Sequence, residues 1–86
     1  MKHLTLLEAP DFKLLKVKEI RGGKGLLRRL FSLGIHEGDL IKKDQSGIFG
    51  GPVLLRNITS NIKVAIGRGI ASKIIVEISD EQRKNT

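Results

Sequence analysis

Histidines and carboxylates are the residues of this 86-residue sequence whose types suit metal chemistry. The chain has two histidines, His3 and His36, and no cysteine. A metal site would need the histidines to join carboxylates such as Glu8, Glu37 or Asp39 in one cluster. Nothing in their spacing forces such a cluster, and the run HEGD that begins at His36 consists of common turn formers. We therefore interpret that run as a solvated turn and predict neither metal ligands nor a cofactor.

The glycine-rich run GGKGLL is similar to a phosphate-binding loop, because glycines let backbone amides approach an anion at a helix N-terminus. A nucleotide-binding loop needs Ser or Thr after its lysine, whereas Lys24 is followed by Gly25 and Leu26. We predict a turn that leads into a helix. The sequence also has no cysteine and no serine in a nucleophile-elbow context, so we predict that the protein is not an enzyme.

Positive charge dominates the chain, with 16 Lys and Arg against 9 Asp and Glu and a net charge of +7. Such a chain attracts an acidic protein surface or a nucleic acid. Base stacking needs exposed aromatic residues, and we expect Phe12 and Phe31 in the core, so the acidic protein surface is the first interpretation and nucleic acid the alternative. The basic residues that could form one continuous positive face are Lys16, Lys18, Arg21, Lys24, Arg28 and Arg29.

Strand patterns occupy the first part of the chain. Residues 4–7 are apolar and end before Pro10, which predicts a brief edge strand or a docked arm. In residues 12–20, Leu15 and Val17 alternate with lysines as in a half-buried strand. Ile20 falls out of phase and indicates a bulge or the end of the strand.

One helix is predicted between these strands and the rest of the chain. In LLRRLFSL four leucines share a face opposite Arg28 and Arg29, and Gly34 follows where a left-handed residue ends a helix. The four leucines are Leu26, Leu27, Leu30 and Leu33.

Strands also dominate the second half. A strand starts at Leu40-Ile41 and becomes polar through Lys42, Lys43 and Asp44. The glycine-rich loop that follows is expected to expose Ile48 and Phe49. PVLLRNI and NIKVAIG predict a hairpin with a positive φ at Asn61, residues 68–72 fit one turn of 3₁₀ helix, and IIVEI is a final strand.

These patterns predict a mainly β domain of about five strands, a number typical of a small sheet that curves into a barrel. The short α-helix lies between the first and second barrel strands. We assign residues 1–79 to the barrel and residues 80–86 to a polar tail. No segment has the apolar length of a secretion signal or a membrane span, which predicts a soluble cytoplasmic protein without membrane insertion.

The segment from Arg28 to Ile41 resembles the signature of the FeoA family, in which an Arg-Leu pair precedes Leu-Gly-Ile and a later glycine. The matching residues are Arg29-Leu30, Leu33-Gly34-Ile35 and Gly38. Downstream, Gly51-Pro52-Val53, Ala65-Ile66-Gly67, Ala71, Ile74 and Val76 continue the resemblance over nearly the whole chain. Two departures are His36-Glu37 in place of Thr-Pro or Ser-Pro, and Asn61 in place of the hairpin glycine.

The resemblance implies an SH3-like barrel that acts in the cytoplasm as an adaptor or regulator of the ferrous-iron permease FeoB and contacts its GTP-binding region. It also implies a place at the inner membrane through that partner. Similar barrels form the C-terminal domain of DtxR-type repressors, but no helix-turn-helix precedes this one. Loop composition and expected exposure select the candidate partner-binding residues Arg28, Arg29, Leu33, Gly34, Ile35, Gly38, Ile48 and Phe49.

Overall fold

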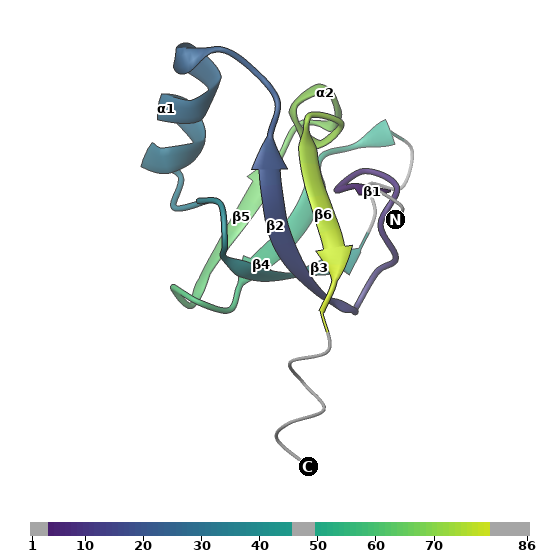
Figure 1. Cartoon of the computed structure of the whole chain (residues 1–86). Helices are drawn as coiled ribbons and strands as arrows, with labels where there is room; N and C mark the ends of the chain where they lie inside the picture. Colours follow the sequence, from purple (N-terminus) through teal and green to yellow (C-terminus); the bar gives the residue numbers. More distant parts are fainter. Residues whose placement is uncertain (1–3, 46–49, 80–86) are drawn as a thin grey trace.

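A computed structural model describes residues 4–45 and 50–79 of the chain (Figure 1). These residues form six strands and two helices, more strands than the five that the sequence predicted. In chain order the elements are β1 (Leu4–Thr5), β2 (Leu14–Ile20), α1 (Lys24–Ser32), β3 (Leu40–Gln45), β4 (Val53–Asn57), β5 (Ile62–Ile66), α2 (Arg68–Ala71) and β6 (Ile74–Ile78). The candidate residues Ile48 and Phe49 and the predicted tail 80–86 lie outside the described residues.

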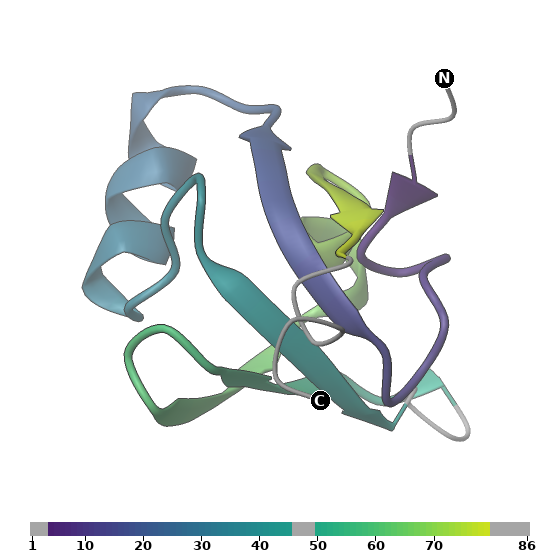
Figure 2. The same ribbon diagram turned by 60° about the horizontal axis from the view of Figure 1, so that its bottom comes forward.

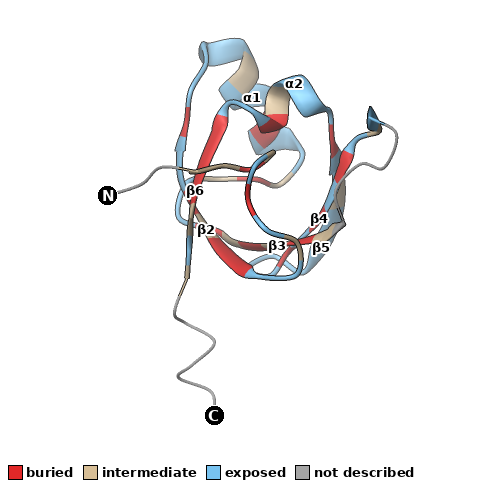
Figure 3. Ribbon diagram, turned by 90° about the vertical axis from the view of Figure 1, so that its right-hand side faces the viewer, coloured by how far each residue is buried: buried red, intermediate tan, exposed pale blue. Residues whose placement is uncertain are grey.

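The strands form one antiparallel sheet in the order β1-β6-β2-β3-β4-β5. The sheet curls around a core of Leu, Ile and Val side chains, and Figure 3 shows the buried residues distributed over its strands. Among the described residues, β1 and β5 do not pair with each other, so the curved sheet stays open at that seam. The additional strand is β1, which pairs with β6 through the register Leu4–Val76 and confirms the predicted edge strand.

A bulge in β2 explains the phase of its apolar residues. Leu15 and Val17 are buried, and the register with β6 shifts between Val17 and Glu19. The extra residue returns Ile20 to the inner face, where it is 8% exposed. The bulge that the sequence indicated at this point is confirmed.

Helix α1 is attached to the barrel mainly through one side chain. Leu30 is fully buried and Leu26 packs partly against the core, whereas Leu27 and Leu33 are 40% and 37% exposed. Of the four leucines predicted to share one helical face, only Leu30 is therefore fully buried.

The expectation that Phe12 and Phe31 lie in the core is also wrong, since they are 64% and 68% exposed. Phe31 follows Leu30 on α1, so it points about 100° away from the buried direction. Phe12 lies in the turn before β2 with a φ of 62°, and its backbone N–H donates to the carbonyl of Lys43. In both cases the local backbone conformation directs the phenylalanine side chain toward solvent.

Lys43 was expected in a polar part of β3, but its side chain is fully buried. It lies opposite Leu55 in the β3–β4 register, on the inner face of the sheet. Its Nζ donates to the carbonyl oxygens of Ala9 at 2.7 Å and Leu7 at 3.3 Å and lies 3.6 Å from a carboxylate oxygen of Asp11. These partners replace the water that a buried ammonium group loses.

Lys43 therefore joins the segment between β1 and β2 to the centre of the sheet. The sequence could not reveal this role, because a lysine in a strand normally faces solvent. The predicted 3₁₀ turn at residues 68–72 is instead the single α-helical turn α2, with Ala71 buried. Within the described ranges, no helix is both long and apolar enough to cross a membrane.

We predict that Lys43→Ala lowers the free energy of unfolding by about 3 kcal/mol, since it opens a cavity and removes the donor that bonds to the carbonyls of Leu7 and Ala9. Lys13→Ala removes an exposed lysine and should change stability by less than about 0.5 kcal/mol. Urea unfolding of both variants measures the difference. Equal effects would show that the buried ammonium group does not hold the two segments together.

Candidate functional site

The turn between α1 and β3 is built around Gly34. Its φ of 87° lets the chain reverse at the end of the helix, where its N–H donates to the carbonyl of Phe31. Ile35 then enters the core and is 1% exposed. A Cβ on Gly34 would collide with Cδ1 of Ile62 at the start of β5. Gly34 is thus required by its backbone angle, and an added Cβ would also have to displace the end of the exposed Ile62 side chain.

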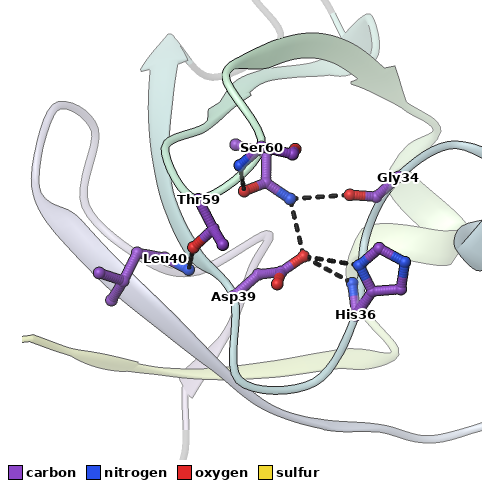
Figure 4. A network of polar contacts seen from close by, with 7 residues as sticks. Gly34, His36, Asp39, Leu40, Thr59 and Ser60 are labelled. Carbon is purple, nitrogen blue, oxygen red and sulfur yellow. Dashed lines mark hydrogen bonds and ion pairs between the residues drawn. The ribbon is translucent and has the colours of Figure 1, made fainter.

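A polar network fixes the same turn to the β4–β5 hairpin (Figure 4). Oδ2 of Asp39 accepts the backbone N–H of His36 at 2.9 Å and lies 3.0 Å from Nδ1 of the same histidine. The amide of Asn57 donates to Oδ2 of Asp39 and to the carbonyl of Gly34, both at 2.8 Å. The fully buried side chain of Asn57 therefore bridges two points of the turn.

The other side of Asn57 organises the hairpin loop. Its Oδ1 accepts the N–H of Ser60 at 3.2 Å, and its carbonyl accepts the N–H of Asn61, which has the predicted positive φ of 60°. The hydroxyl of Thr59 accepts the N–H of Leu40 at 2.9 Å. Figure 2 shows this loop beside the C-terminal end of α1. The hairpin and the helix are held as one unit.

Burial of Asp39 works against its ionisation, but the hydrogen bonds from Asn57 and from the backbone and ring of His36 outweigh burial and lower the pKa of its carboxyl group. The run HEGD is a turn, as predicted, with a positive φ at Gly38. Asp39 is only 8% exposed, however, so the interpretation of the whole run as solvated is wrong. Its carboxylate is a structural acceptor.

A shallow cleft of about 240 Å³ lies between α1 and the end of β2. Ile20 and Ile35 form its buried floor, and Leu27 and Phe31 rise from the helix beside it. The rings of Phe31 and His36 meet edge to face, with centroids 4.6 Å apart. Glu37 completes the lining, and its Oε2 accepts the backbone N–H of Ile20 at 3.2 Å. The cleft thus offers an apolar surface with one aromatic side chain.

The predicted positive face is interrupted by acidic neighbours. Nζ of Lys18 lies 3.7 Å from Oε2 of Glu77, and Nε of Arg21 lies 3.5 Å from Oε1 of Glu19. Arg28 and Arg29 are exposed on α1, and neither forms an ion pair with any carboxylate of residues 4–45 and 50–79. Free positive charge on this side is therefore concentrated on the helix.

The structure divides the predicted partner-binding residues into two groups. Arg28, Arg29 and Leu33 are exposed, whereas Gly34 and Ile35 shape the turn beneath them. The prediction missed Leu27 and Phe31, and Phe31 had been expected in the core. Asn57 was missed as well, because the sequence does not show which hydrogen bonds a single asparagine in a strand will form.

The sequence also placed possible metal ligands in this region. His36 and Asp39 do meet, but Glu37 bonds to Ile20 and Glu8 bonds to Thr5. Among the described residues, no group of three His, Cys, Asp or Glu side chains is arranged to hold a metal ion.

Comparison with known proteins gives a match to the model of the FeoA domain over residues 4–78. A protein of Methanocaldococcus jannaschii named "Putative Fe(2+) transport protein A" is 42% identical over 69 residues, which cover 80% of this chain and 79% of that protein. The crystal structure of an iron uptake regulatory protein (FeoA) superposes with a TM-score of 0.76 at 26% identity, over 90% of this chain and 97% of that one.

A manganese-dependent transcriptional repressor shares the fold, with a TM-score of 0.82 at 21% identity. The match covers 92% of this chain and 38% of the repressor. These superpositions confirm the predicted mainly β, SH3-like fold.

We predict that Gly34→Ala lowers the free energy of unfolding by about 2 kcal/mol or more, because alanine is strained at positive φ and its Cβ displaces Ile62. Gly25→Ala should raise it by about 0.5–1 kcal/mol, since Gly25 lies inside α1 with no atom near the added methyl group. Thermal unfolding of the two variants measures whether each substitution raises or lowers the stability. A loss of stability at Gly25 would contradict the helix boundaries, and an unchanged Gly34→Ala would contradict the close approach of the hairpin.

We also predict a pH-dependent contribution from Asp39. Its pKa is lower in the folded chain than in the unfolded chain, so its ionised form stabilises the fold above about pH 4, and this contribution is lost as the pH falls further. Asp39→Asn should therefore be less stable than the original protein at neutral pH, and the difference should shrink below about pH 4. Urea titrations from neutral to acidic pH test this, with Asp44→Asn as a control for the loss of one negative charge. A difference that stays constant with pH would show that the bonds to Asp39 do not depend on its charge.

Proposed function

This chain belongs to the FeoA domain family, and from that premise we propose that it serves ferrous-iron transport as an accessory protein that binds its transporter. The name of the Methanocaldococcus jannaschii relative supports the assignment to Fe(2+) transport. The observation that carries the binding role is the exposed apolar and cationic surface of α1. We propose that the protein acts by contact and not by catalysis.

The proposed partner is the cytoplasmic GTP-binding region of a FeoB-type ferrous-iron permease. Family resemblance supplies this partner, and it places the chain at the cytoplasmic face of the membrane through the permease. The surface that we assign to the contact consists of the cleft and the outward residues of α1. We call these outward residues the α1 surface; they are Leu27, Arg28, Arg29, Phe31 and Leu33.

The α1 surface has the composition that protein interfaces favour. Phe31 is 68% exposed although it belongs to the helix that holds the buried Leu30. Aromatic and arginine side chains are enriched among the residues that contribute most to binding energy. Arg28 and Arg29 lie next to the apolar residues and would attract an acidic partner, which raises the association rate more than the final affinity.

The turn below the α1 surface supports it without needing to touch the partner. Gly34 and the bridge from Asn57 fix the end of the helix against the hairpin. A partner would therefore meet a preorganised surface and lose little entropy in ordering it. We keep Ile48 and Phe49, which lie outside the described residues, as predicted contact residues.

We predict that Phe31→Ala weakens binding to the soluble cytoplasmic domain of the cognate permease by about tenfold or more, since an exposed aromatic anchor is lost. Phe12→Ala is the matched control, because Phe12 is 64% exposed but lies beyond the opposite end of β2 from α1. NMR titration of the labelled protein with the permease domain measures both affinities and maps the shifted residues.

The titration also tests which face of the protein contacts the permease domain. Shifts concentrated on residues 20–37 would support the α1 surface. Equal affinity of the Phe31→Ala variant and the original protein, with shifts elsewhere, would remove this surface from the proposal. No binding of the original protein at any concentration would remove the partner itself.

A further inference from the structure

A row of three cations crosses the outer face of the sheet, on strands that do not belong to the α1 surface. The strand register places Lys42 of β3 opposite Arg56 of β4, and Arg56 opposite Lys63 of β5. The inward neighbours of Lys42 and Arg56, among them Ile41 and Leu55, are buried, whereas Ile62 beside Lys63 is 38% exposed. We call these three residues the cation row.

The cation row is open to solvent and to ligands. Arg56 and Lys63 are exposed and Lys42 is half-buried. None of the three forms an ion pair with a carboxylate in the described part of the chain. Asp44 lies on β3 two residues from Lys42, and it too forms no described ion pair.

The row is unfavourable for folding. Residues directly opposite on antiparallel strands have Cβ atoms about 5 Å apart, and like charges in such positions destabilise the sheet. A lysine on an edge strand such as β5 can prevent edge-to-edge aggregation, but that role explains Lys63 alone. Two further cations aligned with it are better explained by a ligand with several negative charges.

The surroundings of the row favour one class of ligand. Leu54, which is 42% exposed, and Ala65 form the next pair on the same face. The face lies on the outside of the curved sheet, and the described phenylalanines do not belong to its strands. Binding of single-stranded nucleic acid relies on grooves with aromatic platforms, whereas an anionic lipid surface needs only clustered cations with some apolar area.

We propose that the cation row is a contact site for the anionic phospholipid headgroups of a membrane surface. Three cations about 5 Å apart span about 10 Å, enough to meet more than one headgroup phosphate. Each cation near such a surface contributes about a fivefold gain in binding. A membrane-embedded transporter would also keep the chain near lipid, and only this last support rests on the proposed function.

The experiment is a vesicle sedimentation assay with the whole chain and no permease. We expect binding to vesicles that contain phosphatidylglycerol, weaker binding at about 300 mM than at about 50 mM salt, and none to pure phosphatidylcholine. The triple variant Lys42→Gln, Arg56→Gln, Lys63→Gln should lose about 100-fold in affinity. Its folding is checked by its NMR spectrum.

The matched control removes three cations from α1 instead, as Lys24→Gln, Arg28→Gln, Arg29→Gln. A loss of fivefold or less in this control supports the cation row. An equal loss in both triple variants would overturn the proposal, because net charge alone would then explain binding. Tighter, row-dependent binding to an RNA oligonucleotide than to the anionic vesicles would overturn it in favour of nucleic acid.

The same variants separate this proposal from the proposed function. The cation-row variant should bind the soluble permease domain as the original protein does, because that assay contains no lipid. Failure of permease binding with intact vesicle binding would refute the proposed partner only. Failure of vesicle binding with intact permease binding would refute the lipid contact only.

Discussion

The bridge made by the Asn57 amide is the interaction on which the functional side of this molecule depends. One buried side chain bonds to the turn after α1, to the carboxylate of Asp39 and to the hairpin loop. The turn and the hairpin are distant in the sequence, since Gly34 and Asn57 have a sequence separation of 23. A satisfied polar network in a buried place can specify one arrangement where a thin apolar core would allow several. The helix keeps its position because the turn beneath it is fixed in this way.

Lys43 is a second buried polar side chain that fixes a neighbouring segment, on the opposite side of the barrel. In a domain of this size the core is small, and a chain of 86 residues buries a modest share of its surface. The ammonium group of Lys43 binds carbonyls of the segment between β1 and β2 and so closes that side together with the buried Leu6 and Ala9. Both closures use a polar group from the inner face of a central strand. The barrel is thus completed at two places by hydrogen bonds.

The parts of this structure that follow from local chemistry could be predicted from the sequence. Alternation located β2, the phase of Ile20 located its bulge, and Gly34 and Asn61 were recognised as left-handed residues. Predictions about burial failed where contacts between distant segments decide whether a side chain is buried. The depth of Lys43 depends on a segment more than 30 residues away, as its bonds to Leu7 and Ala9 show, with sequence separations of 36 and 34. Phe31 was misplaced because hydrophobicity alone cannot tell a core residue from an exposed one.

The attachment of α1 through Leu30 has a consequence for how such proteins diversify. The outward residues of the helix take little part in packing, so substitutions there should change the surface at small cost in stability. The barrel and its polar closures can remain unchanged while the helix surface drifts to follow a changing partner. A family built on this plan would be expected to show a slowly varying interior beside a rapidly varying helix. Descendants of one ancestral barrel could then acquire different partners without passing through unfolded intermediates.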